Sequence, residues 1–326
     1  MAKPIRILSI DGGGIRGVMP AIILGEIEKR TGRSISDLFD LIAGTSAGGI
    51  IALALTKPGQ NGRPQYSVKE VIDLFEGRRE QLFHRSLWHR IQSVGNLAEV
   101  KYSSESIRQV MIDFFGETKL SEAVTDVLIP SYEIEQQEPF IFQRDRARRD
   151  QAADFLMSDA ALATSAAPTY YEPHKIETDD LLGYRALVDG LVFASNPTLC
   201  AYAEAKSIHP ENDDFIIVSL GTGEPPHRHV YDDIKNWGSV KWAQPLLDIV
   251  LYGSMMVVDY QIRQLLPPVN GVPRYFRFQP KLGSTETMMD NIEASNIRML
   301  KLLVEELIKS EKEQFETVCK RLTESN

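Results

Sequence analysis

The sequence predicts an α/β sandwich, and three observations carry this prediction. Short apolar stretches alternate with helical patterns along most of the chain, as in folds that pack helices on a sheet. Residues 5–10 are rich in β-branched side chains and lead through three glycines into a helical pattern over 18–30. Residues 41–43 lead through a second small-residue turn into an apolar helical run over 49–55.

The remaining elements follow from hydrophobic periodicity and from turn residues. Further helices are predicted over residues 68–83, 105–115, 151–163, 197–207, 241–266 and 291–322. Further strands are predicted over residues 127–132, 140–142, 185–188, 215–220 and 275–278. The last helix is amphipathic with one charged face, so we expect it to cover the sheet.

Length and composition allow a large core. The chain has 326 residues, of which 43% are hydrophobic. We expect a single domain over residues 1–326, with its core at about 5–225 and a mostly helical extension at about 226–326 packed on that core.

Charge and cysteine content exclude several classes of protein. The formal net charge of −9 gives no general attraction to nucleic acid or to an anionic membrane. Cys200 and Cys319 lie far apart in predicted helices, which argues against a disulfide framework and favours a reducing cytoplasm. No signal peptide precedes the first predicted strand, and the apolar run over 41–55 is too short to span a bilayer. The six histidines do not have the spacing of zinc ligands. We therefore expect a cytoplasmic protein without a metal, an organic cofactor or a nucleic-acid polymer as partner.

The segment Gly44-Thr45-Ser46-Ala47-Gly48 has the Gly-x-Ser-x-Gly pattern between a strand and a helix. This pattern is typical of a nucleophile elbow, a sharp turn that lifts the serine hydroxyl above the sheet. The turn is too tight for side chains at Gly44 and Gly48. Ser46 is therefore a candidate nucleophile.

A glycine-rich turn follows the first strand and ends at Arg16-Gly17. The backbone amides of Gly12, Gly13 and Gly14 can turn outward there and bind an anion or a transition-state oxyanion. Arg16 adds a permanently charged, planar guanidinium group whose paired N–H donors suit a phosphate.

The same turn also fits the dinucleotide fingerprint Gly-x-Gly-x-x-Gly, with Asp37 twenty residues beyond Gly17. In that fold the acidic residue ends the second strand. Here Asp37 and Asp40 precede the next strand instead, so a nicotinamide or flavin enzyme is disfavoured.

Together these two motifs resemble the patatin-like phospholipase family. Three further segments resemble the family in the same order and spacing: Ala163-Thr-Ser-Ala-Ala-Pro-Thr-Tyr-Tyr171, Val188-Asp189-Gly190 and Ser219-Leu-Gly-Thr-Gly223. The resemblance covers roughly residues 5–225. It implies a three-layer α/β/α sandwich around a mostly parallel sheet.

The resemblance also implies a Ser–Asp dyad. Ser46 would be the nucleophile, Asp189 would take its proton and later activate water, and the amides of Gly12 to Gly14 would form the oxyanion hole. Leu191 stands where the family usually has Gly or Ala, which leaves the pose of Asp189 open. A histidine base is the alternative from the residues alone, and the candidates after Asp189 are His209, His227 and His229.

Two stretches could meet substrate or a regulator. Residues 84–94 place Leu87, Trp88, Ile91 and Val94 at near-helical spacing beside basic residues, as in a lid or an interfacial segment, although a core-packed helix fits equally well. Residues 144–150 form a basic cluster that we expect to be a solvated loop paired to Asp145 and Asp150, and otherwise an anion site.

The function that the resemblance implies is hydrolysis of fatty-acyl esters of membrane glycerophospholipids by a cytoplasmic enzyme that acts peripherally at the membrane. Similarity to a bacterial subgroup adds activation by a cyclic nucleotide in anti-phage defence. A soluble esterase or acyltransferase, and a non-catalytic lipid-binding protein of the same fold, stay open as alternatives, and so does homo-oligomerisation.

Overall fold

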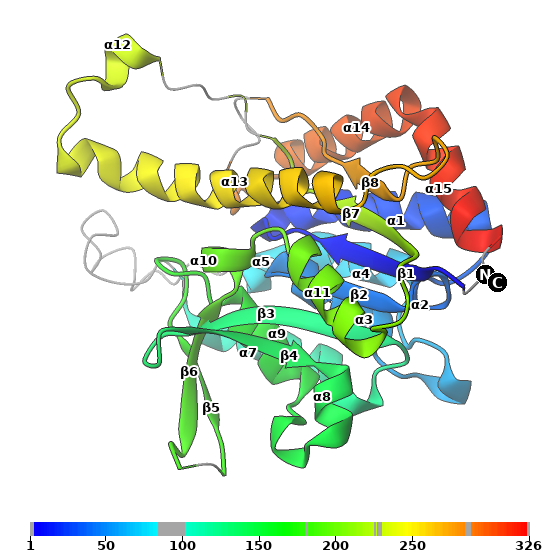
Figure 1. Cartoon of the computed structure of the whole chain (residues 1–326). Coiled ribbons are helices and arrows are strands. Elements are labelled where there is room, and N and C mark those ends of the chain that lie inside the picture. The colour runs from blue at the N-terminus through cyan, green and yellow to red at the C-terminus, as the bar shows by residue number, and fades with distance from the viewer. Residues whose placement is uncertain are drawn as a thin grey trace.

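A computed structural model of the whole chain describes residues 3–83, 102–179, 181–224, 226, 230–283 and 288–324. A single sheet lies at its centre, and helices cover both faces (Figure 1). The predicted fold class, an α/β sandwich around a mostly parallel sheet, is therefore confirmed. The described part of the chain contains no helix with both the length and the hydropathy needed to cross a bilayer.

The sheet has eight strands in the order β5-β6-β3-β2-β1-β7-β8, with β4 also paired to β3. The strands are β1 (Ile5–Ile10), β2 (Leu41–Gly44), β3 (Asp126–Glu133), β4 (Glu138–Gln143), β5 (His174–Glu177), β6 (Tyr184–Asp189), β7 (Phe215–Leu220) and β8 (Tyr275–Phe278). Neighbours from β3 through β8 pair in parallel, whereas β4, β5 and β6 pair antiparallel. The carboxyl ends of β1 and β2 therefore lie side by side, which brings the two glycine-containing turns together.

Alternating side chains of the strands divide the core between the two faces. Leu8 and Ile10 of β1 point into the larger cluster, and Ile7 points into the smaller one. The larger cluster is built with α1 (Val18–Thr31), α3 (Ala47–Thr56), α4 (Val68–Gly77), α7 (Ser104–Phe115), α9 (Met157–Ser165), α14 (Ala294–Ser310) and α15 (Lys312–Glu324). The smaller cluster is built with α11 (Thr198–Ile208) and α13 (Ser239–Leu265).

Several predicted helices are interrupted in the structure. The helix predicted over 68–83 breaks at Arg78, where ψ is 15°, into α4 and α5 (Arg79–Leu82). The helix predicted over 291–322 breaks at Glu311, where ψ is 28°, into α14 and α15. The helix predicted over 151–163 begins only at Met157, after a short 3-10 turn over Gln151–Ala153. Hydrophobic periodicity continues across such breaks because both halves pack on the same core.

The structure corrects the prediction of a loop for the basic cluster at residues 144–150. Residues 144–149 form the short helix α8 (Arg144–Arg149) rather than a solvated loop. Arg149 pairs with Asp145 one turn earlier, and Arg144 Nη1 lies 2.7 Å from Asp126 Oδ1. The pairing to Asp145 was predicted, and a pair at this spacing supports a short helix. Two of the four arginines of the cluster are therefore engaged in ion pairs.

The shortest helices complete the chain and are α2 (Ile35–Leu38), α10 (Leu191–Ala194) and α12 (Tyr231–Ile234). The long helix α13 extends well past the sheet toward α12 (Figure 1). Apolar side chains are exposed along it at helical spacing, and they are Leu246, Ile249, Val250, Val257 and Tyr260. The predicted segment 84–94 lies outside the described residues, and so do His227 and His229.

Candidate active site

Ser46 occupies a strained turn between β2 and α3. Its backbone has φ 56° and ψ −126°, which a residue with a side chain seldom adopts. A Cβ at Gly44 would lie 2.0 Å from the Gly48 carbonyl oxygen, and one at Gly48 would lie 2.3 Å from the Ile10 carbonyl oxygen. The tightness predicted for this turn is therefore confirmed, and the turn holds the serine at the carboxyl edge of the sheet.

Thr164 of α9 holds the elbow from the other side. The backbone amide of Ser46 donates to Thr164 Oγ1 at 2.9 Å, and that hydroxyl donates to the Pro130 carbonyl of β3 at 2.6 Å. Thr164 is fully buried. The segment 163–171, which sequence analysis singled out only by resemblance, thus fixes the backbone on which Ser46 stands.

Asp189 ends β6 and is fully buried. Its Oδ1 accepts a hydrogen bond of 2.9 Å from the backbone amide of Leu191. Oδ2 is buried and meets no donor with hydrogen-bond geometry among the described residues, while the nearby Ser46 hydroxyl still favours the ionised carboxylate. One oxygen is therefore anchored and the other is left available beside Ser46. The group of Leu191 that holds the carboxylate is its backbone amide, which Gly or Ala at this position would also supply.

The pKa of Asp189 is raised to about 7. Burial is the main cause, and the nearby Ser46 hydroxyl and the hydrogen bond from the Leu191 amide oppose it. A base with a pKa near 7 takes and returns a proton readily at neutral pH. The environment of Asp189 thus suits it to general acid–base chemistry.

The glycine loop lies against the elbow. A Cβ at Gly12 would be 3.2 Å from Ser46 Cβ. The family resemblance implies an oxyanion hole at Gly12, Gly13 and Gly14, but the Gly12 amide already donates to the Ser195 carbonyl at 3.0 Å. The amides of Gly13 and Gly14 have no such acceptor within the part of the chain described. The amides of Gly13 and Gly14 are therefore the remaining candidate donors to an oxyanion.

Residues after β7 fasten this loop, which sequence analysis did not foresee. Thr222 Oγ1 donates to the Gly12 carbonyl at 2.6 Å, and the Ile15 amide donates to the Met289 carbonyl at 2.8 Å. Asp11, which precedes the loop, pairs with Arg277 of β8. The only sequence signal for Arg277 was an arginine inside an otherwise aromatic strand.

Arg16 follows the glycine loop and is half-buried. Its Nε donates to the Gly13 carbonyl at 3.4 Å. Burial lowers its pKa to about 10, so it stays charged at neutral pH. The side chain is not among those that line the cavity beside Ser46. The hydrogen bond to the Gly13 carbonyl supports the loop, and the contact of Arg16 with a phosphate stays a prediction.

His209 lies near the amino-terminal ends of the parallel strands, whereas Ser46 lies at their carboxyl ends. It follows α11, and the turn after it approaches the start of β1, where Asn212 Nδ2 donates to the Lys3 carbonyl at 2.9 Å. Ser46 follows the other end of the neighbouring strand. His209 is therefore too remote to act as the base. Asp37 likewise lies in α2, before β2, which matches the objection to a dinucleotide site.

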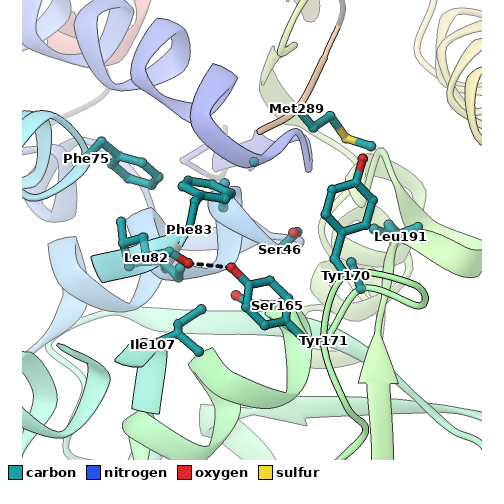
Figure 2. A pocket seen from close by; sticks show the side chains of 14 residues that line it. Ser46, Phe75, Leu82, Phe83, Ile107, Ser165, Tyr170, Tyr171, Leu191 and Met289 are labelled. Carbon is teal, nitrogen blue, oxygen red and sulfur yellow. Dashed lines mark hydrogen bonds between the residues drawn. The ribbon is translucent and has the colours of Figure 1, made fainter. Parts of the chain in front are cut away.

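An apolar cavity opens beside Ser46, with about 540 Å³ of empty space including its mouth. Its apolar walls are formed by Ile50, Phe75, Leu82, Phe83, Ile107 and Leu191. Figure 2 shows Ser46 between Phe75 and Phe83 on one side and Tyr170 on the other. Tyr171 closes part of the wall and donates from its hydroxyl to the Leu82 carbonyl. A hydrocarbon chain attached to a carbonyl at Ser46 would find apolar walls here.

Sequence comparisons with known proteins point to one family. The family model described as patatin-like phospholipase matches residues 8–202. Patatin-like protein 4 of Arabidopsis thaliana is 33% identical over 93% of this chain and 83% of its own length. Patatin-03 of Solanum tuberosum is 30% identical over 95% of this chain and 85% of its own length.

A third relative, probable inactive patatin-3-Kuras 1 of Solanum tuberosum, is 30% identical over 98% of this chain and 92% of its own. The family match covers more than half of the chain and includes both turns and Asp189. The chain therefore belongs to the patatin-like phospholipase family, a family of serine hydrolases with lipid acyl hydrolase activity.

Proposed function

We propose that the protein hydrolyses fatty-acyl esters of membrane glycerophospholipids through an acyl-enzyme on Ser46, with Asp189 as the base. The observation that carries this proposal is a strained serine that lines an apolar cavity and has a buried carboxyl group of pKa about 7 beside it.

The first half of the reaction forms the acyl-enzyme. Ser46 Oγ attacks the ester carbonyl carbon while its proton passes to Asp189. The negative charge then develops on the carbonyl oxygen, where the amides of Gly13 and Gly14 stabilise it. When the carbon–oxygen bond to the glycerol breaks, Asp189 returns the proton to the departing alkoxide.

The second half releases the fatty acid. Asp189 accepts a proton from water, whose oxygen attacks the acyl carbon, and the same amides hold the oxyanion. The bond to Ser46 Oγ breaks and the serine regains a proton from Asp189. The products are a lysophospholipid and a free fatty acid, and the protein returns to its starting state.

Contact with a bilayer requires an apolar surface, and α13 offers one. Leu246, Ile249, Val250, Val257 and Tyr260 are each more than 40% exposed and recur at helical spacing. The segment 84–94 stays a second prediction, because it lies outside the described residues.

The test is release of fatty acid from mixed phospholipid liposomes, measured by mass spectrometry for the wild type, Ser46→Ala and Asp189→Asn. We expect release by the wild type and its loss in both variants. Turnover of a soluble short-chain ester with none on liposomes would favour the esterase alternative. No turnover of either substrate would favour a lipid-binding protein.

Activation by a cyclic nucleotide in anti-phage defence stays a prediction, as does a cytoplasmic location. The plant relatives described above give no support to such activation. The liposome assay with and without a panel of cyclic nucleotides tests it, and an unchanged basal rate would exclude it.

A further inference from the structure

A second, polar pocket adjoins the apolar cavity. It holds about 380 Å³ of empty space including its mouth. Ile107, Ser165 and Tyr171 line both hollows, so these three side chains form the wall between them. Figure 2 shows Ser165 beside Tyr171, between Ser46 and Ile107. The polar pocket thus begins one side chain away from the candidate nucleophile.

Two buried hydroxyl groups in this pocket lack partners. Ser165 is 7% exposed, and its Oγ makes no hydrogen bond within the described residues. Ser104 Oγ is buried and is equally without a partner there. Leaving a buried hydroxyl unsatisfied costs free energy, so a site that does so is suited to a ligand with acceptor atoms.

The pocket also lies at the N-terminal turn of α7, a helix of twelve residues. Ser104, Ile107 and Arg108 of that turn line it. The N-terminus of a helix carries partial positive charge and favours an anion. Arg108 is half-buried and has no ion pair or hydrogen bond among the residues that the structure describes. With respect to the described residues, all of its N–H donors are therefore available to a ligand.

The other ionisable groups at or beside the pocket are His174, Asp159 and Glu172. His174 is 6% exposed, and its Nε2 lies 3.0 Å from Asp159 Oδ1, which fixes the ring orientation. Glu172 lines the rim and is exposed, so it can turn toward solvent. Hydroxyl groups, a cation and an oriented imidazole thus line the pocket together with apolar residues such as Leu162.

We propose that this pocket binds an oxyanion of the lipid, either the phosphate of the phospholipid head group or the carboxylate of the released fatty acid. The proposal rests on the proposed function, because it places the ligand relative to an ester at Ser46. Only a few bonds separate the ester carbon of a glycerophospholipid from its phosphorus. A phosphate in the polar pocket and an acyl chain in the apolar cavity can therefore belong to one molecule.

The experiment compares Arg108→Gln with the wild type on two substrates of equal acyl length. One is diheptanoyl phosphatidylcholine below its micelle concentration, and the other is the neutral ester p-nitrophenyl heptanoate. Inhibition by heptanoate is measured in parallel. Arg298→Gln is the matched control, since Arg298 is an exposed arginine of α14.

If the phosphate binds there, Arg108→Gln raises KM for the phospholipid about tenfold, a loss of about 1.4 kcal/mol, and leaves the neutral ester within about twofold. If the carboxylate binds there, the inhibition constant of heptanoate rises about tenfold and KM for the phospholipid is unchanged. Equal losses on both substrates, no change in any of these constants, or the same effect in Arg298→Gln would overturn the proposal.

A binding measurement separates this proposal from the proposed function. Isothermal titration of inorganic phosphate and of heptanoate into Ser46→Ala protein requires no turnover. Binding of either anion that Arg108→Gln abolishes supports the pocket even if no substrate is hydrolysed. Absence of binding for both anions, or binding that Arg108→Gln leaves intact, would contradict the pocket while the hydrolase assignment stands.

Discussion

Asp11, which directly follows β1, and Arg277 of β8 form a buried, bidentate ion pair. Their side chains are 0% and 8% exposed, and Arg277 Nη1 also donates to Ser219 Oγ of the intervening strand at 2.8 Å. Although burial opposes the charge of Arg277, the Asp11 carboxylate holds its pKa above the usual range. Because Asp11 directly precedes Gly12, the pair anchors the loop that we assign to oxyanion binding.

We therefore predict that Arg277→Met destabilises the protein and slows turnover. Removing one partner of a buried ion pair leaves an uncompensated charge and costs about 3–5 kcal/mol. Urea unfolding measures the stability, and kcat on a soluble ester measures the effect on the loop. The double variant with Asp11→Leu should recover much of the lost stability, because no charge is left buried. A double variant whose loss equals the sum of the single losses would show that the pair is not coupled.

The raised pKa of Asp189 predicts a pH dependence. Asp189 accepts the serine proton only when ionised, and burial raises its pKa to about 7. On a soluble ester, kcat/KM should rise as the pH passes through about 7 and level off above it. The residual activity of Asp189→Asn should lack this step. A wild-type rate already maximal at pH 5 would exclude Asp189 as the titrating base.

Gly14 and Gly32 form a matched pair for testing the oxyanion loop. Both have left-handed backbones, with φ of 58° and 66°. A Cβ at Gly14 would lie 2.1 Å from the Met289 carbonyl oxygen, whereas one at Gly32 meets nothing within 4 Å. Gly32→Ala should cost about 1–2 kcal/mol of stability with normal kcat. Gly14→Ala should lower kcat by on the order of 10²-fold, as loss of an oxyanion donor does. Comparable kcat values for both variants would remove Gly14 from the oxyanion hole.

The exposed face of α13 predicts a difference between bilayer and monomeric substrates. Val257 is 52% exposed, and Leu302 of α14 is 54% exposed. Val257→Glu should weaken liposome binding and liposome hydrolysis, because a charge replaces an apolar contact, while turnover of a soluble ester stays normal. Leu302→Glu is the control and should change neither. Normal liposome hydrolysis by Val257→Glu would show that another surface meets the bilayer.

The sequence predicted the elements that local patterns specify. The strand over Tyr275–Phe278 and the strand over Phe215–Leu220 have the predicted bounds, and the tightness at Gly44 and Gly48 is confirmed. Each of these depends on neighbouring residues alone, through β-branched or aromatic content or through a turn that excludes side chains.

Contacts between distant segments were not predictable in this way. Nothing near Arg277 in the sequence indicates that it meets Asp11, 266 positions earlier. The hydrogen bond from the Gly12 amide to the Ser195 carbonyl also joins distant segments. The position of Ser165 in the wall between the two pockets likewise depends on distant segments. Helix breaks at Arg78 and Glu311 were missed because apolar spacing continues across them.

The central claim is that Ser46 is a nucleophile activated by Asp189, and covalent labelling tests it most directly. The protein is incubated with an alkyl fluorophosphonate, which reacts with activated serines, and the adduct is located by peptide mass spectrometry. We predict one adduct on Ser46, none in Ser46→Ala, and labelling slowed by about 10²-fold or more in Asp189→Asn. An adduct on another residue, or labelling of Asp189→Asn at the wild-type rate, would contradict this claim.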